Sequence, residues 1–213
     1  MPPLADESAL LLDLQGLARQ GRYREVVDRI TALPSAVAAA RSPLALLAAE
    51  ALGRLGEHEG AARWAARAFE LARSQRDTPT ELRSVHLQGA IAWQRGALEE
   101  AERHFQRVLE LARAVQDVAA EARAFNNLGI LQNLRGNPAE ALATYQLALA
   151  AYQQAGSLRG IAETHTNLEI SWLAMGNARR ARDAADEAVR LAREVGDATL
   201  VAVALVARAE ANL

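Results

Sequence analysis

Cysteine and lysine are both absent from the 213-residue chain, so all 24 basic residues are arginine. Without cysteine there is no disulfide and no thiolate chemistry, which favours an intracellular, cytoplasmic protein. Without lysine the phosphate-binding pattern Gly-x-x-x-x-Gly-Lys cannot occur. No apolar run reaches the ~18 residues of a membrane span and no signal peptide opens the chain, so no membrane association is expected.

Aromatic residues make up only 4% of the chain, and valine, isoleucine and threonine form no alternating runs, so neither a core built on rings nor a β-sheet is indicated. Hydrophobic residues make up 51% and alanine is abundant, which favours closely packed helices. The net charge is −2, and acidic residues are spread among the arginines without a basic stripe. Direct nucleic-acid binding is therefore not expected. The bias toward alanine and arginine indicates a bacterial genome.

A period of 40 residues runs through the chain. Small residues recur at this spacing, namely Gly56, Gly96, Gly136 and Gly176, then Ala61, Ala101, Ala141 and Ala181, and also Gly89 and Gly129. A fixed period of this size is typical of repeat proteins. We expect the glycines at 56, 96, 136 and 176 to end helices in a left-handed conformation.

Capping residues divide each repeat into two helices. Expected helix starts are Ser42-Pro43, Thr78 with Glu81 as a capping box, Asn137-Pro138, and the caps Asp117, Ser157, Asn177 and Asp197. The expected helix pairs span 7–33, 43–75, 79–116, 118–155 and 158–195, with a terminal helix at 198–212. Since the connections are short, successive helices are antiparallel neighbours. We expect one elongated domain.

The pattern Phe125-x-x-Leu128-Gly129-x-x-Gln132, followed by Ala141-x-x-x-Tyr145, resembles the tetratricopeptide repeat (TPR). The resemblance implies an all-α, right-handed superhelical solenoid of about five helix pairs plus a terminal helix. It also implies a non-catalytic scaffold that binds a protein or peptide partner. The 40-residue length is similar to the repeats of the LGN and kinesin-light-chain group and of MalT-type bacterial regulators.

In this family the first helix of each pair lines a concave groove. Helical-wheel positions place on that face a set of polar and apolar side chains: Arg83, His86, Trp93, Arg123, Asn126, Asn127, Ile130, Asn133, Thr166, Asn167 and Ile170. Amides suit the backbone of an extended peptide, and the aliphatic residues suit its side chains. The alternative is that these residues are ordinary surface amides or support the next repeat. The carboxylate clamp of Hsp70- and Hsp90-binding members is not expected, because only Asn127 fits it.

No arrangement of residues indicates catalysis, a metal or another cofactor. The four histidines are scattered over different helices and form no i, i+4 pair, so zinc binding is not expected. Glu169 is unusual because it occupies the place that Gly129 holds in the preceding repeat. We favour the interpretation that Ala185 leaves it room to reach water or an arginine such as Arg182. The alternative is a functional carboxylate.

The terminal helix is apolar on more than one side. We expect either that the chain is a fragment of a longer array or that this helix contacts another subunit through Leu200, Val203, Leu205 and Val206. Three functions therefore stay open. The first is a scaffold that binds a partner segment in the groove. The second is the sensory domain of a bacterial regulator that binds a short peptide or effector. The third is a self-association module that forms a homodimer through the terminal helix.

Overall fold

The computed structural model describes residues 4–33 and 41–211, and every regular element within these ranges is an α-helix. The described helices are α1 (Leu4–Arg19), α2 (Tyr23–Thr31), α4 (Ser42–Arg54), α5 (His58–Gln75), α6 (Thr78–Gln94), α7 (Leu98–Val115), α8 (Val118–Leu134), α9 (Pro138–Gln154), α10 (Leu158–Ala174), α11 (Ala178–Val195) and α12 (Ala198–Glu210). The all-α prediction is confirmed. The expected end of the last helix at residue 212 lies outside the described ranges. None of the described helices is long and apolar enough to cross a membrane.

The chain divides into two compact units, residues 1–104 and residues 105–213, and the division falls inside α7. Each unit is described by itself. The expectation of one elongated domain stays a prediction.

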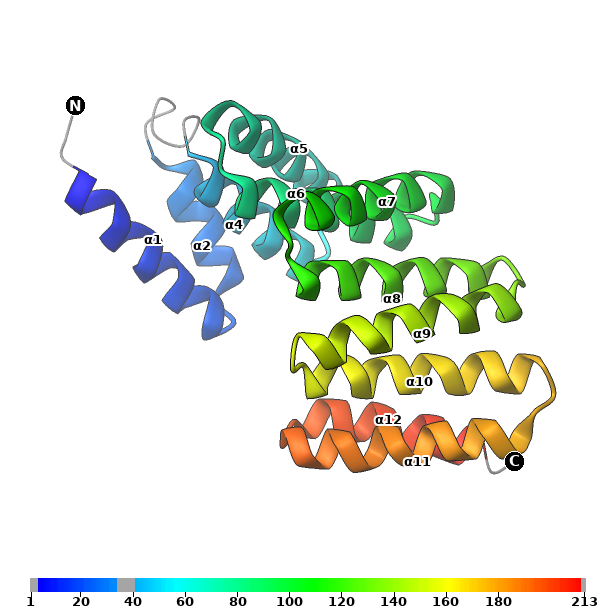
Figure 1. Ribbon diagram of the computed structural model, residues 1–213. Helices are drawn as coiled ribbons and strands as arrows, with labels where there is room; N and C mark the ends of the chain where they lie inside the picture. The colour runs from blue at the N-terminus through cyan, green and yellow to red at the C-terminus, as the bar shows by residue number, and fades with distance from the viewer. Residues whose placement is uncertain (1–3, 34–40, 212–213) are drawn as a thin grey trace. The chain divides into compact units, whose positions relative to one another are not determined.

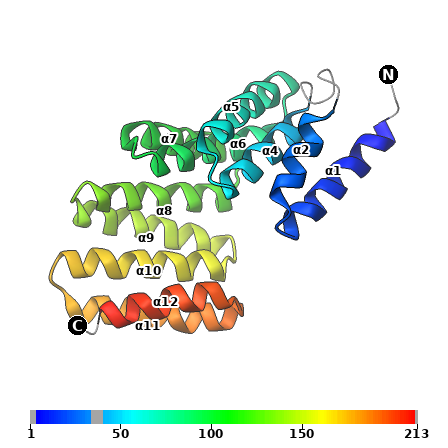
Figure 2. The same ribbon diagram turned by 180° about the vertical axis from the view of Figure 1, so that it is seen from behind.

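In unit 1, α4 packs against α5 and α2, α5 packs against α6, and α1 packs against α2 and α4 (Figures 1 and 2). The core contains aliphatic side chains such as Leu14, Ile30 and Leu44. On α5 the four fully buried positions are all alanine, namely Ala61, Ala65, Ala68 and Ala72. Because these side chains are small, the backbone of α5 can lie close to its neighbours.

In unit 2, α9 packs between α8 and α10, and α11 packs between α10 and α12, with successive helices running in opposite directions (Figure 1). Helix α12 contacts both α10 and α11, as α10 contacts both α8 and α9. It therefore holds the place of the first helix of a further pair.

Two glycines of unit 2 are required by close approach to a tyrosine ring. A β-carbon on Gly129 would lie 2.5 Å from Cε1 of Tyr145, and one on Gly160 would lie 2.3 Å from the ring of Tyr152. Both distances are shorter than carbon atoms tolerate, so the two tyrosines fill the space that the missing side chains leave.

Helix ends follow the repeat closely. The glycines at 56, 96, 136 and 176 have φ between 72° and 79°, as expected for the left-handed turn after a first helix. The second helices end in the same way at Arg76, Gln116, Gly156 and Gly196, which are again 40 residues apart. This second series was not predicted, because only two of its four members are glycine.

The predicted caps are correct in part. The side chains of Asp117, Ser157, Asn177 and Asp197 accept hydrogen bonds from N–H groups in the first turn of their helices. Asn137 precedes α9 but makes no such bond. Two predictions were wrong by one residue. Asp77 rather than Thr78 caps α6, and Ser42 lies inside α4, where its hydroxyl bonds instead to Gln75 and Asp77.

Candidate functional site

Two adjoining hollows of about 500 Å³ and 260 Å³ lie in unit 1 on the side of α1, α4 and α6. They share a lining of Ala18, Arg19, Leu47 and Glu50, so we describe them together as the first-helix groove. The volume of the larger hollow lies within the range of ordinary ligand sites. The groove is partly open to solvent, so a segment of another protein can reach it.

The groove combines an apolar wall with excess positive charge. Leu47, Leu87 and Ile91 supply the apolar part, and Arg19 and Arg54 line the groove beside them. Neither arginine has a carboxylate within ion-pairing distance among the described residues. Arg83 differs, because its Nη2 lies 2.7 Å from Oε1 of Glu50. The wall therefore carries three guanidinium groups and one carboxylate, which favours a ligand with negative charge.

The predicted residues of unit 1 lie partly in this groove. Arg83 lines it, whereas His86 is half-buried and Trp93, with 41% of its surface exposed, is not among its lining residues. Sequence reasoning missed the residues from α1 and α4. A signal was present, since a shift of 40 from Leu87, Ala90 and Gln94 gives Leu47, Glu50 and Arg54. It was overlooked because the early repeats match the family pattern poorly.

In unit 2 a polar seam joins α8 to α10. Oδ1 of Asn126 accepts hydrogen bonds from Nδ2 of Asn167 at 3.0 Å and from Oγ1 of Thr164 at 3.1 Å. Nearer the other end of the helices, Nδ2 of Asn133 donates to Oγ of Ser171 at 2.8 Å, and the Ser171 hydroxyl lies 3.0 Å from Oδ1 of Asn133. Asn126 is only 7% exposed. These amides bond one repeat to the next.

Asn126, Asn133 and Asn167 therefore bond one repeat to the next, and their contact with a partner segment stays a prediction. Asn133 and Asn167 are half-buried, and the other predicted groove residues of unit 2 are half-buried or exposed. Arg123 and Ile170 are exposed, and Asn127, Ile130 and Thr166 are half-buried. Their contact with a partner segment stays a prediction.

Glu169 does not reach water or an arginine, so the favoured interpretation of this residue was wrong. Its side chain is fully buried, and neither carboxylate oxygen has a hydrogen-bond partner among the described residues. Arg182 instead donates from Nε to the carbonyl oxygen of Ala178. Burial, with a smaller contribution from Glu210, raises the pKa of Glu169 from 4.5 to about 7. A buried carboxyl without a partner is much more stable protonated than ionised.

Trp172 packs against buried residues of α11, and the guanidinium of Arg180 lies 4.6 Å from its ring centre. Within the described ranges, no three histidine or acidic side chains lie close enough to hold a metal ion.

The predicted self-association residues divide into two pairs. Leu200 is buried and Leu205 is half-buried against α10 and α11, whereas Val203 and Val206 are 50% and 59% exposed.

Comparison with known proteins agrees with this architecture. Residues 80–154 match the family model of the tetratricopeptide repeat. No curated protein matches the chain. Among solved structures, aspartyl phosphate phosphatase F from Bacillus subtilis is 15% identical with a TM-score of 0.73, and the match covers 78% of this chain but only 44% of that one.

Two further structures have a similar fold. A Rap protein complexed with competence and sporulation factor is 14% identical with a TM-score of 0.73, covering 93% of this chain and 62% of that one. MamA is 14% identical with a TM-score of 0.62, covering 90% and 94%. At these identities the likeness concerns the fold alone.

Proposed function

We propose that this chain of tetratricopeptide repeats is a non-catalytic scaffold that holds an extended segment of a partner protein in the first-helix groove of unit 1. The observation that carries the proposal is the open groove itself, with its apolar wall of Leu47, Leu87 and Ile91. A solved Rap structure of similar fold is described as a complex with competence and sporulation factor, which supports ligand binding by folds of this kind.

The charges of the groove indicate the class of segment. Arg19 and Arg54 have no acidic partner among the described residues, and an incoming carboxylate can accept two parallel hydrogen bonds from each guanidinium. We therefore expect a segment with an aspartate or glutamate next to an apolar residue. The cytoplasm, as the composition suggests, is the setting we assign to this interaction.

A displayed library of random twelve-residue peptides, selected on the immobilised protein, tests the proposal. Enriched peptides should carry an acidic residue beside an apolar one. Ala90→Trp fills the groove without a change of charge and should abolish their binding, while Arg54→Glu should weaken it at least about tenfold. Arg63→Glu on the outer side of α5 is the matched control and should bind as the wild type does. Peptides that bind Ala90→Trp unchanged would refute the groove as the site.

A second candidate is self-association through α12, because Val203 and Val206 are exposed one turn apart on this helix. Exposed apolar side chains at this spacing can pack against the same side chains of a second copy. The test is the solution mass by light scattering, with the double variant Val203→Glu and Val206→Glu. A dimer that becomes a monomer supports this function, and a wild-type monomer at all concentrations excludes it. Leu205, which the sequence analysis also named, packs inward. A substitution there could unfold α12, so a loss of association would not identify the interface.

A further inference from the structure

A further hollow of unit 1, of about 230 Å³, is lined by residues of α5, α6 and the start of α7. It shares one lining residue, Ile91, with the first-helix groove, so it is a separate site. Ala62 of α5 and Ala92 of α6 belong to its apolar part, and its polar part consists of Gln88, Arg95, Glu100 and His104. Sites for drug-sized ligands have volumes of roughly 300–1,000 Å³, so this smaller hollow suits a single ring system.

The equivalent place in unit 2 is filled by the ring of Trp172. A shift of two periods, which is 80 residues, takes Ala92 to Trp172. Other lining positions shift onto residues of the apolar cluster against which this tryptophan packs, namely Ala62 to Leu142, Gln88 to Leu168 and His104 to Ala184. The guanidinium of Arg180 lies 4.6 Å from the centre of the ring. This place in the repeat therefore accommodates an indole ring.

The hollow of unit 1 exists because alanine replaces two large side chains. Ala92 stands where α10 has Trp172, and Ala62 stands where α9 has Leu142. Ala92 is only 3% exposed, so the wall beside it belongs to the packed interior of the repeat. Cavities with apolar walls of this kind can bind aromatic molecules.

The polar side chains of the hollow differ in charge from those around Trp172. Glu100 holds the place of Arg180, so a carboxylate replaces the guanidinium. The face of an aromatic ring is negative and its edge is positive, so Glu100 favours a ring edge, and above all an N–H group there. Burial lowers the pKa of His104 below its ordinary value, and Glu100 partly opposes this effect. The imidazole, whose Nε2 lies 3.8 Å from Glu100, is therefore uncharged at pH 7 and does not neutralise the carboxylate.

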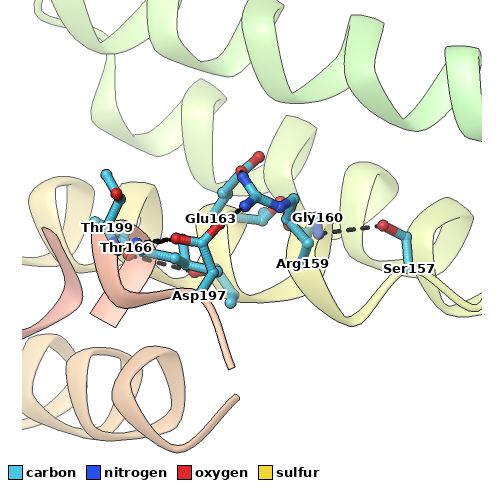
Figure 3. A network of polar contacts seen from close by, with 10 residues as sticks. Ser157, Arg159, Gly160, Glu163, Thr166, Asp197 and Thr199 are labelled. Carbon is cyan, nitrogen blue, oxygen red and sulfur yellow. Dashed lines mark hydrogen bonds and ion pairs between the residues drawn. The ribbon is translucent and has the colours of Figure 1, made fainter. Parts of the chain in front are cut away.

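A cation for the face of a ring is available on α6. Arg95 lines the hollow, is exposed and forms no ion pair among the described residues. The arginine at the start of α10 differs, because Arg159 pairs with Asp197 and also lies 3.3 Å from Glu163 (Figure 3). Arg95 can therefore stack on an incoming ring without giving up an ion pair.

We propose that the hollow between α5, α6 and α7 binds an aromatic ring of indole size that carries an N–H group, in the place that Trp172 fills in unit 2. The ring lies against Ala62 and Ala92, its N–H donates a hydrogen bond to the carboxylate of Glu100, and Arg95 covers its outer face. A free compound and a side chain of another protein present the same chemistry to this hollow.

Titration of the full chain with indole, followed by the ¹H–¹⁵N NMR signals of the backbone amides, tests this proposal. Saturable shifts are expected at Ala62, Ala92 and His104. Benzothiophene has the same shape but no N–H, so it should bind at least about tenfold more weakly. In Glu100→Met, which removes the acceptor at an exposed position, the advantage of indole should disappear. Glu140→Met on α9 is the matched control and should keep it.

Ala92→Trp fills the hollow from within and should abolish the binding of indole. The double variant Ala92→Trp and Glu100→Arg reproduces the ring and guanidinium of unit 2 and should be equally inactive. Should Ala92→Trp not fold, Ala66→Leu replaces it. Ala66 lines the hollow at an exposed position, so the larger side chain obstructs the entrance and should weaken binding at least about tenfold.

N-acetyl-tryptophanamide distinguishes the two sources of the ring. Binding as tight as that of indole identifies a side chain of another protein, and binding of indole alone identifies a free compound. Three results would overturn the proposal: no saturable shift at the hollow, binding that persists unchanged in Ala92→Trp or its replacement, or an advantage of indole over benzothiophene that remains in Glu100→Met.

Discussion

The helix pairs α8/α9 and α10/α11 place large and small residues in opposite ways. In the first pair Tyr145 of the second helix lies against Gly129 of the first, and its ring is fully buried. In the second pair the corresponding residues, 40 positions later, are Ala185 and Glu169, both fully buried. The large side chain has moved from the second helix to the first. The comparison shows that the repeat conserves the volume between its helices but not the chemistry that fills it.

The chemical difference has consequences. Tyr145 keeps its hydroxyl bonded, since Nδ2 of Asn133 donates to it at 3.3 Å. Glu169 has no such partner among the described residues. One pair is therefore filled by a satisfied ring, and the other by a carboxyl whose charge is unfavourable. This places a source of pH dependence in the pair next to α12.

The largest effect is expected where the ring fills the space. Tyr145→Ala removes a fully buried aromatic side chain and should lower the free energy of unfolding by about 3–5 kcal/mol. Ala185→Gly at the corresponding position of α11 should cost only about 1 kcal/mol, the difference in helix propensity. Urea titration of both variants measures the contrast. Equal losses would show that position 185 is packed as tightly as position 145.

Glu169→Gln should remove a pH dependence of the free energy of unfolding that comes from the pair α10/α11 and has no counterpart in the pair α8/α9. Since folding raises the pKa of Glu169, its contribution is most favourable at low pH and is lost between pH 4.5 and 7. The wild type should therefore lose up to about 2–3 kcal/mol relative to the variant between pH 5 and pH 8. Thermal unfolding at the two pH values measures it, and parallel pH profiles would argue against a carboxyl of raised pKa.

Asn126→Ala tests the seam that joins the two pairs. It leaves the Asn167 amide without its acceptor and deprives Thr164 of a polar neighbour, so the expected loss of stability is about 1–2 kcal/mol. Asn137→Ala is the matched control, because Asn137 is exposed and its side chain makes no capping bond. If the two substitutions cost the same, the seam adds no measurable stability.

The smallest effect concerns the ends of the second helices. Gln116 has φ of 58°, in the left-handed region that favours glycine, where the two later repeats carry Gly156 and Gly196. Gln116→Gly should raise the free energy of unfolding by about 0.5–1 kcal/mol, and Gly156→Ala should lower it by about 1 kcal/mol. Chemical denaturation of the two variants checks the signs, and a loss in Gln116→Gly would mean that its side chain stabilises the turn.

Most of the architecture could be predicted from local signals in the sequence. The period of 40, the glycines after each first helix and the caps at Asp117, Ser157 and Asp197 each depend on a few neighbouring residues, so they were readable without coordinates. The candidate groove was readable only in part. The face of α6 with Arg83 was found, but the contribution of Arg19 and Arg54 depends on how α1 and α4 lie beside α6. The grouping with LGN, kinesin light chains or MalT-type regulators stays a prediction.

The sequence by itself determined that this protein is a series of helix pairs, because helix periodicity, caps and small residues act over a few residues and repeat at a fixed spacing. The tertiary structure decided which polar groups face water. Asn126 and Asn167 looked like groove residues on a helical wheel, yet they bond α8 to α10, and Glu169 looked able to reach solvent, yet it lies buried near α12. A helical wheel gives the direction of a side chain, while burial depends on which neighbouring helix lies in that direction.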